Sequence, residues 1–93
     1  MLHIVKSQAG IKEAIQYSAS HDIILLVEDA VYAANTHHHA FEYLVNSKLA
    51  IYVLMPDVDA RGLRSCIDDN VAKADFSDWV TLTEVHETTL TWE

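Results

Sequence analysis

The only sulfur nucleophile in this 93-residue sequence is Cys66. A cysteine that attacks or carries sulfur needs a thiolate, which a helix N-terminus or neighbouring cations stabilise. Cys66 falls late in an expected helix and is followed by Asp68 and Asp69, and only Arg64 offers a positive charge nearby. The sequence therefore predicts no catalytic residue, and a persulfide carrier at Cys66 is the alternative.

Three consecutive histidines, His37-His38-His39, are the most visible candidates for metal ligands. Successive positions of an α-helix point about 100° apart, so three in a row cannot meet on one ion. Only a pair formed with Glu42 would share a helix face, and two ligands make a weak site. We expect a solvated helix start, with neither a metal nor a cofactor. The other histidines are scattered and suggest no catalytic triad.

Two adjacent acids, Glu28 and Asp29, directly follow the most apolar segment of the chain. In open α/β sheets, functional sites form beyond the carboxyl ends of the strands. Carboxylates at such a position could hold Mg²⁺ or face a cationic neighbour. We favour the plainer interpretation, in which they solvate the end of the strand and cap the helix that follows.

The elements that must position these residues alternate between strand and helix. The run Ile23–Val27 has no polar face, so it predicts a central strand covered on both sides. Strands are expected over 2–5, 22–29, 49–55, 71–74 and, as an edge strand, 88–93. Helices are expected over residues 8–19, over 30–46, from residue 57 or 59 to about residue 66, and over 78–87. The second of these helices is expected to break near residues 35–36. This alternation predicts a three-layer α/β/α fold with a mainly parallel sheet of four to five strands.

Side-chain types within these elements predict helix starts and buried positions. The candidate N-cap residues are Ser7 or Gly10, Thr36, Asp57 or Asp59, and Ser77. The second helix should bury a stripe of Phe41, Leu44 and Val45. Trp79 and Trp92 are large for so small a core. Each could be buried within the domain or against another subunit, so both are candidates for a subunit interface, together with Leu90, Glu28 and Asp29. For Trp92, on the expected edge strand, we favour the interface.

Charge and composition exclude several classes of function. Six Lys and Arg face fourteen Asp and Glu, a formal charge of −8, which disfavours nucleic acids and anionic membranes as partners. Two glycines cannot form a glycine-rich phosphate loop, and one cysteine cannot form an internal disulfide. The N-terminus lacks the pattern of a signal peptide, and no apolar run is long enough to span a bilayer. We expect one cytoplasmic domain over residues 1–93 with a thin core that favours an oligomer.

Several short motifs, in their order along the chain, resemble the DsrH family of the DsrE/DsrF/DsrH-like superfamily. They are Met1–His3, Leu25–Val31 with Ala33-Ala34, Asp57–Leu63, Asp75–Thr83 and the near-terminal Trp92. The resemblance covers essentially the whole chain. One departure is Ala30, where the family usually has glycine, and alanine fits there if its φ is negative.

The resemblance implies a DsrE/F/H-like fold and a non-catalytic structural subunit of a sulfur-relay (sulfurtransferase) complex, which is required for 2-thiolation of wobble uridine in tRNA. It implies TusC-like and TusD-like subunits as partners in a hetero-oligomer, and TusA-like and TusE-like sulfur carriers as indirect ones. The sulfur-carrying cysteine would belong to the TusD-like subunit. A DsrH-like subunit of a sulfur-oxidation complex is a further alternative. The tRNA system is favoured because the first helix lacks the cysteine that some relatives have there.

Overall fold

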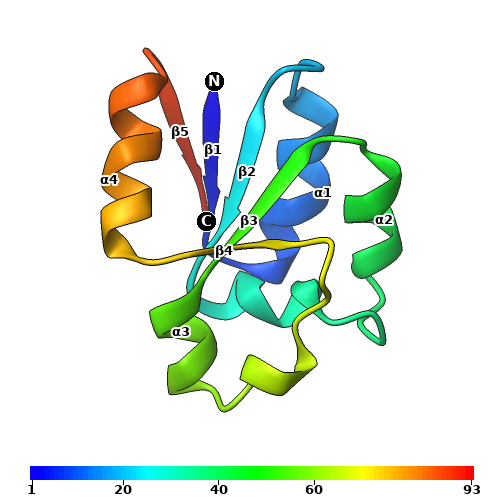
Figure 1. Ribbon diagram of the computed structural model, residues 1–93. Helices are drawn as coiled ribbons and strands as arrows, with labels where there is room; N and C mark the ends of the chain where they lie inside the picture. The colour runs from blue at the N-terminus through cyan, green and yellow to red at the C-terminus, as the bar shows by residue number, and fades with distance from the viewer.

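A five-stranded, wholly parallel sheet forms the centre of the computed structural model, which describes residues 1–93 (Figure 1). The strand order is β4-β3-β2-β1-β5. The strands are β1 (Leu2–Val5), β2 (Ile23–Leu26), β3 (Ala50–Leu54), β4 (Ala72–Ala74) and β5 (Thr89–Trp92). The helices are α1 (Gln8–Tyr17), the 3₁₀ helix η1 (Glu28–Ala34), α2 (Phe41–Asn46), α3 (Met55–Ala60), the 3₁₀ turn η2 (Arg64–Cys66) and α4 (Phe76–Val85).

The strand β2 takes the central position that its apolar run predicts. Ile24, Leu25 and Leu26 are completely buried, and β2 pairs in parallel with β1 on one side and β3 on the other. The tail forms the predicted edge strand, because β5 pairs only with β1. The predicted fold class is thereby confirmed. None of the helices has the length and apolar character that a membrane-spanning helix needs.

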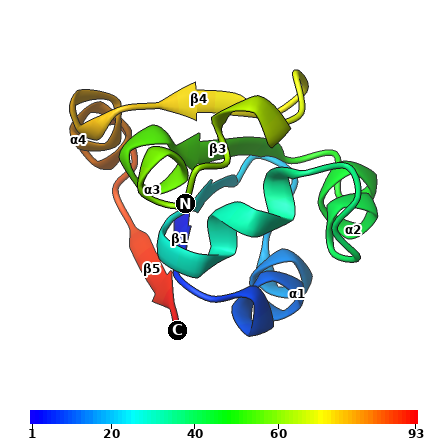
Figure 2. The ribbon, with the colours of Figure 1, turned by 90° about the horizontal axis from the view of Figure 1, so that it is seen from below.

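The two faces of the sheet are covered unequally. Seen along the strands, α1, α2 and η1 lie on one side and α4 lies on the other (Figure 2). The larger core cluster has 16 buried residues and includes side chains of α1, η1 and α2. The smaller cluster has six, with Trp79 and Leu82 of α4 packed against it. The α4 side of the sheet is therefore the thinner layer.

The start of α1 confirms one of the two predicted caps. The Ser7 hydroxyl accepts a hydrogen bond from the N–H of Gly10 at 3.3 Å, so Ser7 rather than Gly10 is the N-cap. The helix ends at Tyr17, two residues before the predicted Ala19. The N–H of Ala19 instead donates to the carboxylate of Asp22.

The predicted second helix is wrong over most of its length. The 3₁₀ helix η1 starts at Glu28, turns follow, and α2 begins only at Phe41, so Thr36 caps nothing. The side chain of Asn35 accepts the N–H of His37 at 2.9 Å, a local bond that competes with helix propagation. In α2, Leu44 is buried as predicted, but Val45 is 48% exposed and does not belong to the core.

Two further helix starts also differ from their predictions. The helix α3 begins at Met55 with Pro56 in its first turn, where a missing N–H costs nothing, so neither Asp57 nor Asp59 is its N-cap. It ends before Gly62, whose φ of +66° breaks the predicted continuation to Cys66. The helix α4 is capped by Asp75 instead of Ser77, through a reciprocal capping box with Asp78.

Candidate functional site

The turn after β2 brings Glu28 into contact with a carboxylate from α3. Glu28 has a φ of +48°, in the left-handed region that residues other than glycine avoid. Its N–H donates to Asp57 Oδ2 at 2.6 Å, which holds this turn in place. Ala30 is completely buried and keeps a negative φ, so alanine fits this position without strain. The strained position is Glu28.

This geometry predicts opposite outcomes for two glycine substitutions. In Glu28→Gly, relief of the left-handed strain offsets the added freedom of the unfolded chain, so stability should stay within about 0.5 kcal/mol or rise. Ala30→Gly removes a buried methyl group and adds the same freedom, so it should cost about 1–2 kcal/mol. Urea unfolding followed by circular dichroism measures both. Equal losses at the two positions would contradict the assignment of strain to Glu28.

Both acids of the predicted pair have cationic neighbours within the chain. Arg61 donates to Asp29 Oδ1 from Nη2 at 3.0 Å and from Nε at 3.3 Å. Lys6 Nζ lies 3.9 Å from a Glu28 carboxylate oxygen and 3.7 Å from one of Glu93. No group of three or more His, Cys, Asp or Glu side chains is placed to hold a metal ion. The structure thus gives both carboxylates a cationic neighbour, Arg61 for Asp29 and Lys6 for Glu28. Their role at a subunit interface stays a prediction.

Cys66 lies apart from this network, at the end of the three-residue turn η2. Its side chain is exposed and forms no hydrogen bond. Arg64, the only cation that the sequence places near it, is held by Asp59 through two hydrogen bonds of 2.8 and 2.7 Å. A site that stabilises a thiolate needs a cation or a helix N-terminus directed at the sulfur, and this turn offers neither.

The three histidines stand in turns before α2, not at the start of a helix. His38 Nε2 lies 2.8 Å from Gln8 Oε1, and its Nδ1 accepts the N–H of Ala40 at 3.0 Å, so the proton is on Nε2. Burial and the charge of the stacked His39 lower the pKa of His38. His39 borders a shallow depression of about 210 Å³ between α1 and α2, and His37 is exposed. His38 therefore joins two segments of the fold, the start of α1 and the turns before α2.

A buried polar chain links the start of β1 to the end of β5, and its hydrogen bonds were not predicted from the sequence. His3 is completely buried, and its Nδ1 accepts the indole N–H of Trp92 at 3.0 Å. Because the indole can only donate, His3 carries its proton on Nε2, which lies 2.9 Å from Asp22 Oδ2. The α-amino group of Met1 and the N–H of Ala19 also donate to Asp22, each at 3.0 Å. The only sequence signal was a histidine inside an apolar strand.

The aromatic interface candidates occupy opposite faces of the sheet. Trp92 is partly buried and packs edge-on against Tyr17, with ring centroids 5.6 Å apart, so it fills an intramolecular site. Leu90, two residues earlier on β5, pairs with His3 in the sheet register and is partly buried. Trp79 lies on α4, packed against the smaller core cluster. The interface role of all three stays a prediction.

Comparison with known proteins identifies relatives of this chain. The family model described as "DsrH like protein" matches residues 6–89. A protein of Klebsiella pneumoniae named Protein TusB is 41% identical over 71 residues, which cover 76% of this chain and 75% of the relative. The Protein TusB of Pectobacterium parmentieri is 34% identical over 95 residues, which cover 99% of this chain and all of the relative.

A solved structure confirms the fold independently of the sequence. The YchN protein from E. coli superposes with a TM-score of 0.75 over 97% of both chains, at 19% sequence identity. At that identity the likeness concerns the fold alone. It agrees with the parallel sheet and layers described above.

Proposed function

From the premise that this chain belongs to the DsrH family, we propose that it is a structural subunit of a sulfur-relay complex that serves 2-thiolation of wobble uridine in tRNA. In this role the chain supplies contact surface for its partners and carries no sulfur itself. A TusD-like subunit would carry the persulfide, and a TusC-like subunit would complete the assembly. TusA-like and TusE-like carriers would deliver and receive the sulfur.

The observation that carries this proposal is the setting of Cys66. Persulfide transfer needs a thiolate that is accessible and sufficiently acidic. Cys66 is accessible, but the nearby guanidinium of Arg64 is bound to Asp59 and the turn η2 is too short to provide a helix N-terminus. The chain contains no second cysteine, which supports a reactive sulfur on another subunit.

The charge of the chain supports protein partners over direct contact with tRNA. A formal charge of −8 repels a phosphate backbone and attracts basic protein surfaces. We therefore place the chain in a cytoplasmic hetero-oligomer in which other components meet the tRNA.

Replacing Cys66 by serine tests this role directly. We expect Cys66→Ser to restore tRNA 2-thiolation to a strain that lacks the gene, within about twofold of the wild-type gene, because the thiol takes no part in transfer. The 2-thiouridine content is measured by mercury-affinity gel electrophoresis of total tRNA. Ser65→Ala, a neighbouring exposed position, is the matched control.

Two results would contradict the proposal. If Cys66→Ser failed as completely as the gene deletion while Ser65→Ala worked, Cys66 would be a sulfur carrier. Intact-mass analysis after incubation with a persulfide donor would then show a Cys66-dependent gain of one sulfur atom, about 32 Da. If the wild-type gene did not affect thiolation at all, a sulfur-oxidation complex would be the better assignment.

A further inference from the structure

Three of the six large hydrophobic side chains that are exposed belong to one helix, α4. Phe76 is 59% exposed, Val80 55% and Val85 71%. The other three are spread over three elements: Tyr17 on α1, Tyr32 on η1 and Val45 on α2. Single exposed hydrophobic residues are ordinary, but several on one element indicate a contact surface.

Three side chains near the start of α4 form an apolar surface. Phe76 and Val80 are one turn apart, so they share a face of the helix. The Phe76 ring stacks on Trp79 with centroids 6.4 Å apart and planes inclined by 21°. We call Phe76, Trp79 and Val80 the α4 patch. No residue of α4 is fully buried, and only Trp79 and Leu82 pack against the core beneath it.

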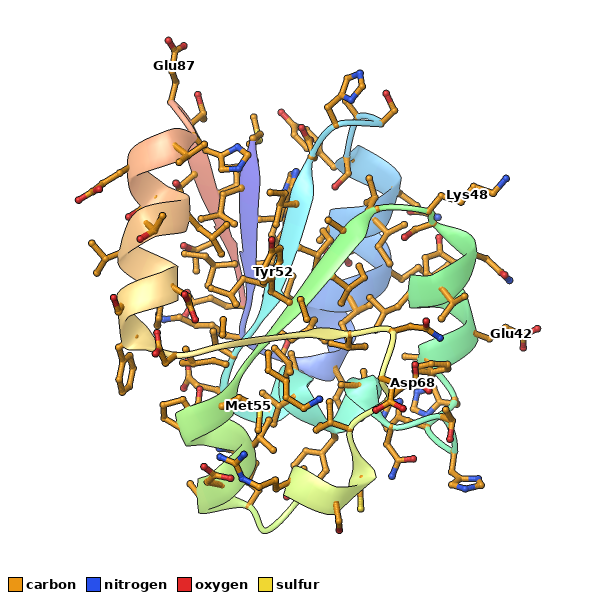
Figure 3. All side chains as sticks on the ribbon, viewed as in Figure 1. Glu42, Lys48, Tyr52, Met55, Asp68 and Glu87 are labelled. Carbon is orange, nitrogen blue, oxygen red and sulfur yellow. The ribbon has the colours of Figure 1, made fainter.

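The segment that carries the α4 patch is acidic. No Lys or Arg occurs from Ala74 to the end of the chain, whereas the acids of this segment are Asp75, Asp78, Glu84, Glu87 and Glu93. Figure 3 shows Glu87 projecting away from the molecule beyond the end of α4. In the same view Tyr52 lies over the middle of the sheet, and it is one of the partly buried side chains that border the smaller core cluster.

These charges indicate which kind of partner could cover the α4 patch. In a symmetric dimer formed through α4, the same acids would face one another and repel. Nucleic acid and anionic membrane are disfavoured because the segment has no cation. A protein surface with an apolar centre and a border of Lys and Arg would match both the patch and its rim.

We propose that the α4 patch is the surface by which this chain binds a partner subunit whose apolar face is bordered by Lys and Arg. The assignment rests on the proposed function, since it names the face that a structural subunit would use. It places the contact on the thinner layer of the fold, where a partner would cover the outer side of α4.

Val80→Glu tests the patch, with Val45→Glu as its matched control. Both positions are valines of similar exposure, 55% and 48%, and they lie on opposite layers. The chain is co-expressed with its TusC-like and TusD-like partners, and the amount retained on a tagged partner is measured. We expect Val80→Glu to reduce the amount of chain retained at least about tenfold. Val45→Glu should leave the retained amount within about twofold of the wild type. Phe76→Ser, at a position 59% exposed, is a second variant.

The acidic rim is tested separately by charge reversal. Glu84→Lys should weaken retention and reduce its sensitivity to salt, whereas Glu42→Lys, at a residue that points outward from α2 (Figure 3), should do neither. Each variant is first required to unfold at the wild-type urea midpoint. If Val80→Glu and Phe76→Ser are both retained as well as the wild-type chain, the α4 patch is not the contact surface, and the proposed function stands. If the wild-type chain is not retained, the proposed function fails and the assignment fails with it.

Discussion

Replacing Trp92 by phenylalanine is expected to lower the free energy of unfolding by about 1–3 kcal/mol, because it removes a hydrogen-bond donor from a buried acceptor. The indole N–H of Trp92 is the donor that His3 Nδ1 accepts, and His3 is completely buried. Phenylalanine keeps most of the contact with Tyr17 but cannot donate. Without the indole, His3 Nδ1 is left as a buried acceptor with no partner in the chain.

Trp79→Phe is the matched control for this substitution. The indole of Trp79 forms no hydrogen bond and its side chain is also partly buried, so the same truncation should cost less than about 1 kcal/mol. Urea unfolding is followed by far-ultraviolet circular dichroism, since both variants change tryptophan fluorescence. In a His3→Leu background, Trp92→Phe should cost clearly less, because the acceptor is gone. Equal costs for the two tryptophans in both backgrounds would show that the bond between Trp92 and His3 contributes nothing.

The strands were predictable because burial alone determines their patterns. A strand covered on both faces is largely apolar, and the unbroken apolar run Ile23–Val27 fits the centre of a sheet. An edge strand needs alternation, and Leu90 and Trp92 are the two partly buried residues of β5. Parallel pairing then follows from the helices that separate the strands.

The segment between β2 and β3 was not predictable from periodicity. Ala30, Val31, Ala33 and Ala34 are all buried, and such a cluster suits a 3₁₀ helix as well as the first turns of an α-helix. What decides between them is local: the bond between Asn35 and the N–H of His37 ends the helix before the histidines. A helix period measured over a few residues cannot detect this bond.

The partners of the polar side chains depend on tertiary structure that no local pattern contains. Asp57 was predicted as an N-cap, yet it accepts a hydrogen bond from Glu28, 29 positions earlier. Arg61 binds Asp29 across 32 positions, and Trp92 binds His3 across 89. Each pair requires the sheet order and register before its contact can be foreseen. The sequence thus located the carboxyl edge of the sheet but not the bonds formed along it.

The stability of the chain should depend on acid through Asp22. Burial by itself would raise the pKa of this carboxyl, but the hydrogen bonds from His3 and Ala19 and the ammonium group of Met1 outweigh it. Together they hold the pKa well below its ordinary value of 3.8. The folded state therefore favours the charged carboxylate more than the unfolded state does. The resulting stabilisation is complete above about pH 5 and is lost as the pH falls through 4 and below.

Asp22→Asn should consequently cost on the order of 2 kcal/mol near pH 7, because it removes the charge that three donors share. The difference between the variant and the wild-type chain should shrink steadily below about pH 4, since Asp22 of the unfolded wild-type chain then binds a proton that the folded state does not, which lowers the stability of the wild type. Asp29→Asn is the control: its carboxylate is paired with Arg61 but 68% exposed, so its loss should cost only a few tenths of a kcal/mol. Urea midpoints between pH 3 and 7 give both curves. A cost for Asp22→Asn that stayed constant over this range would mean that its carboxylate supports His3 by shape alone, whereas convergence in acid would assign the stabilisation to its charge.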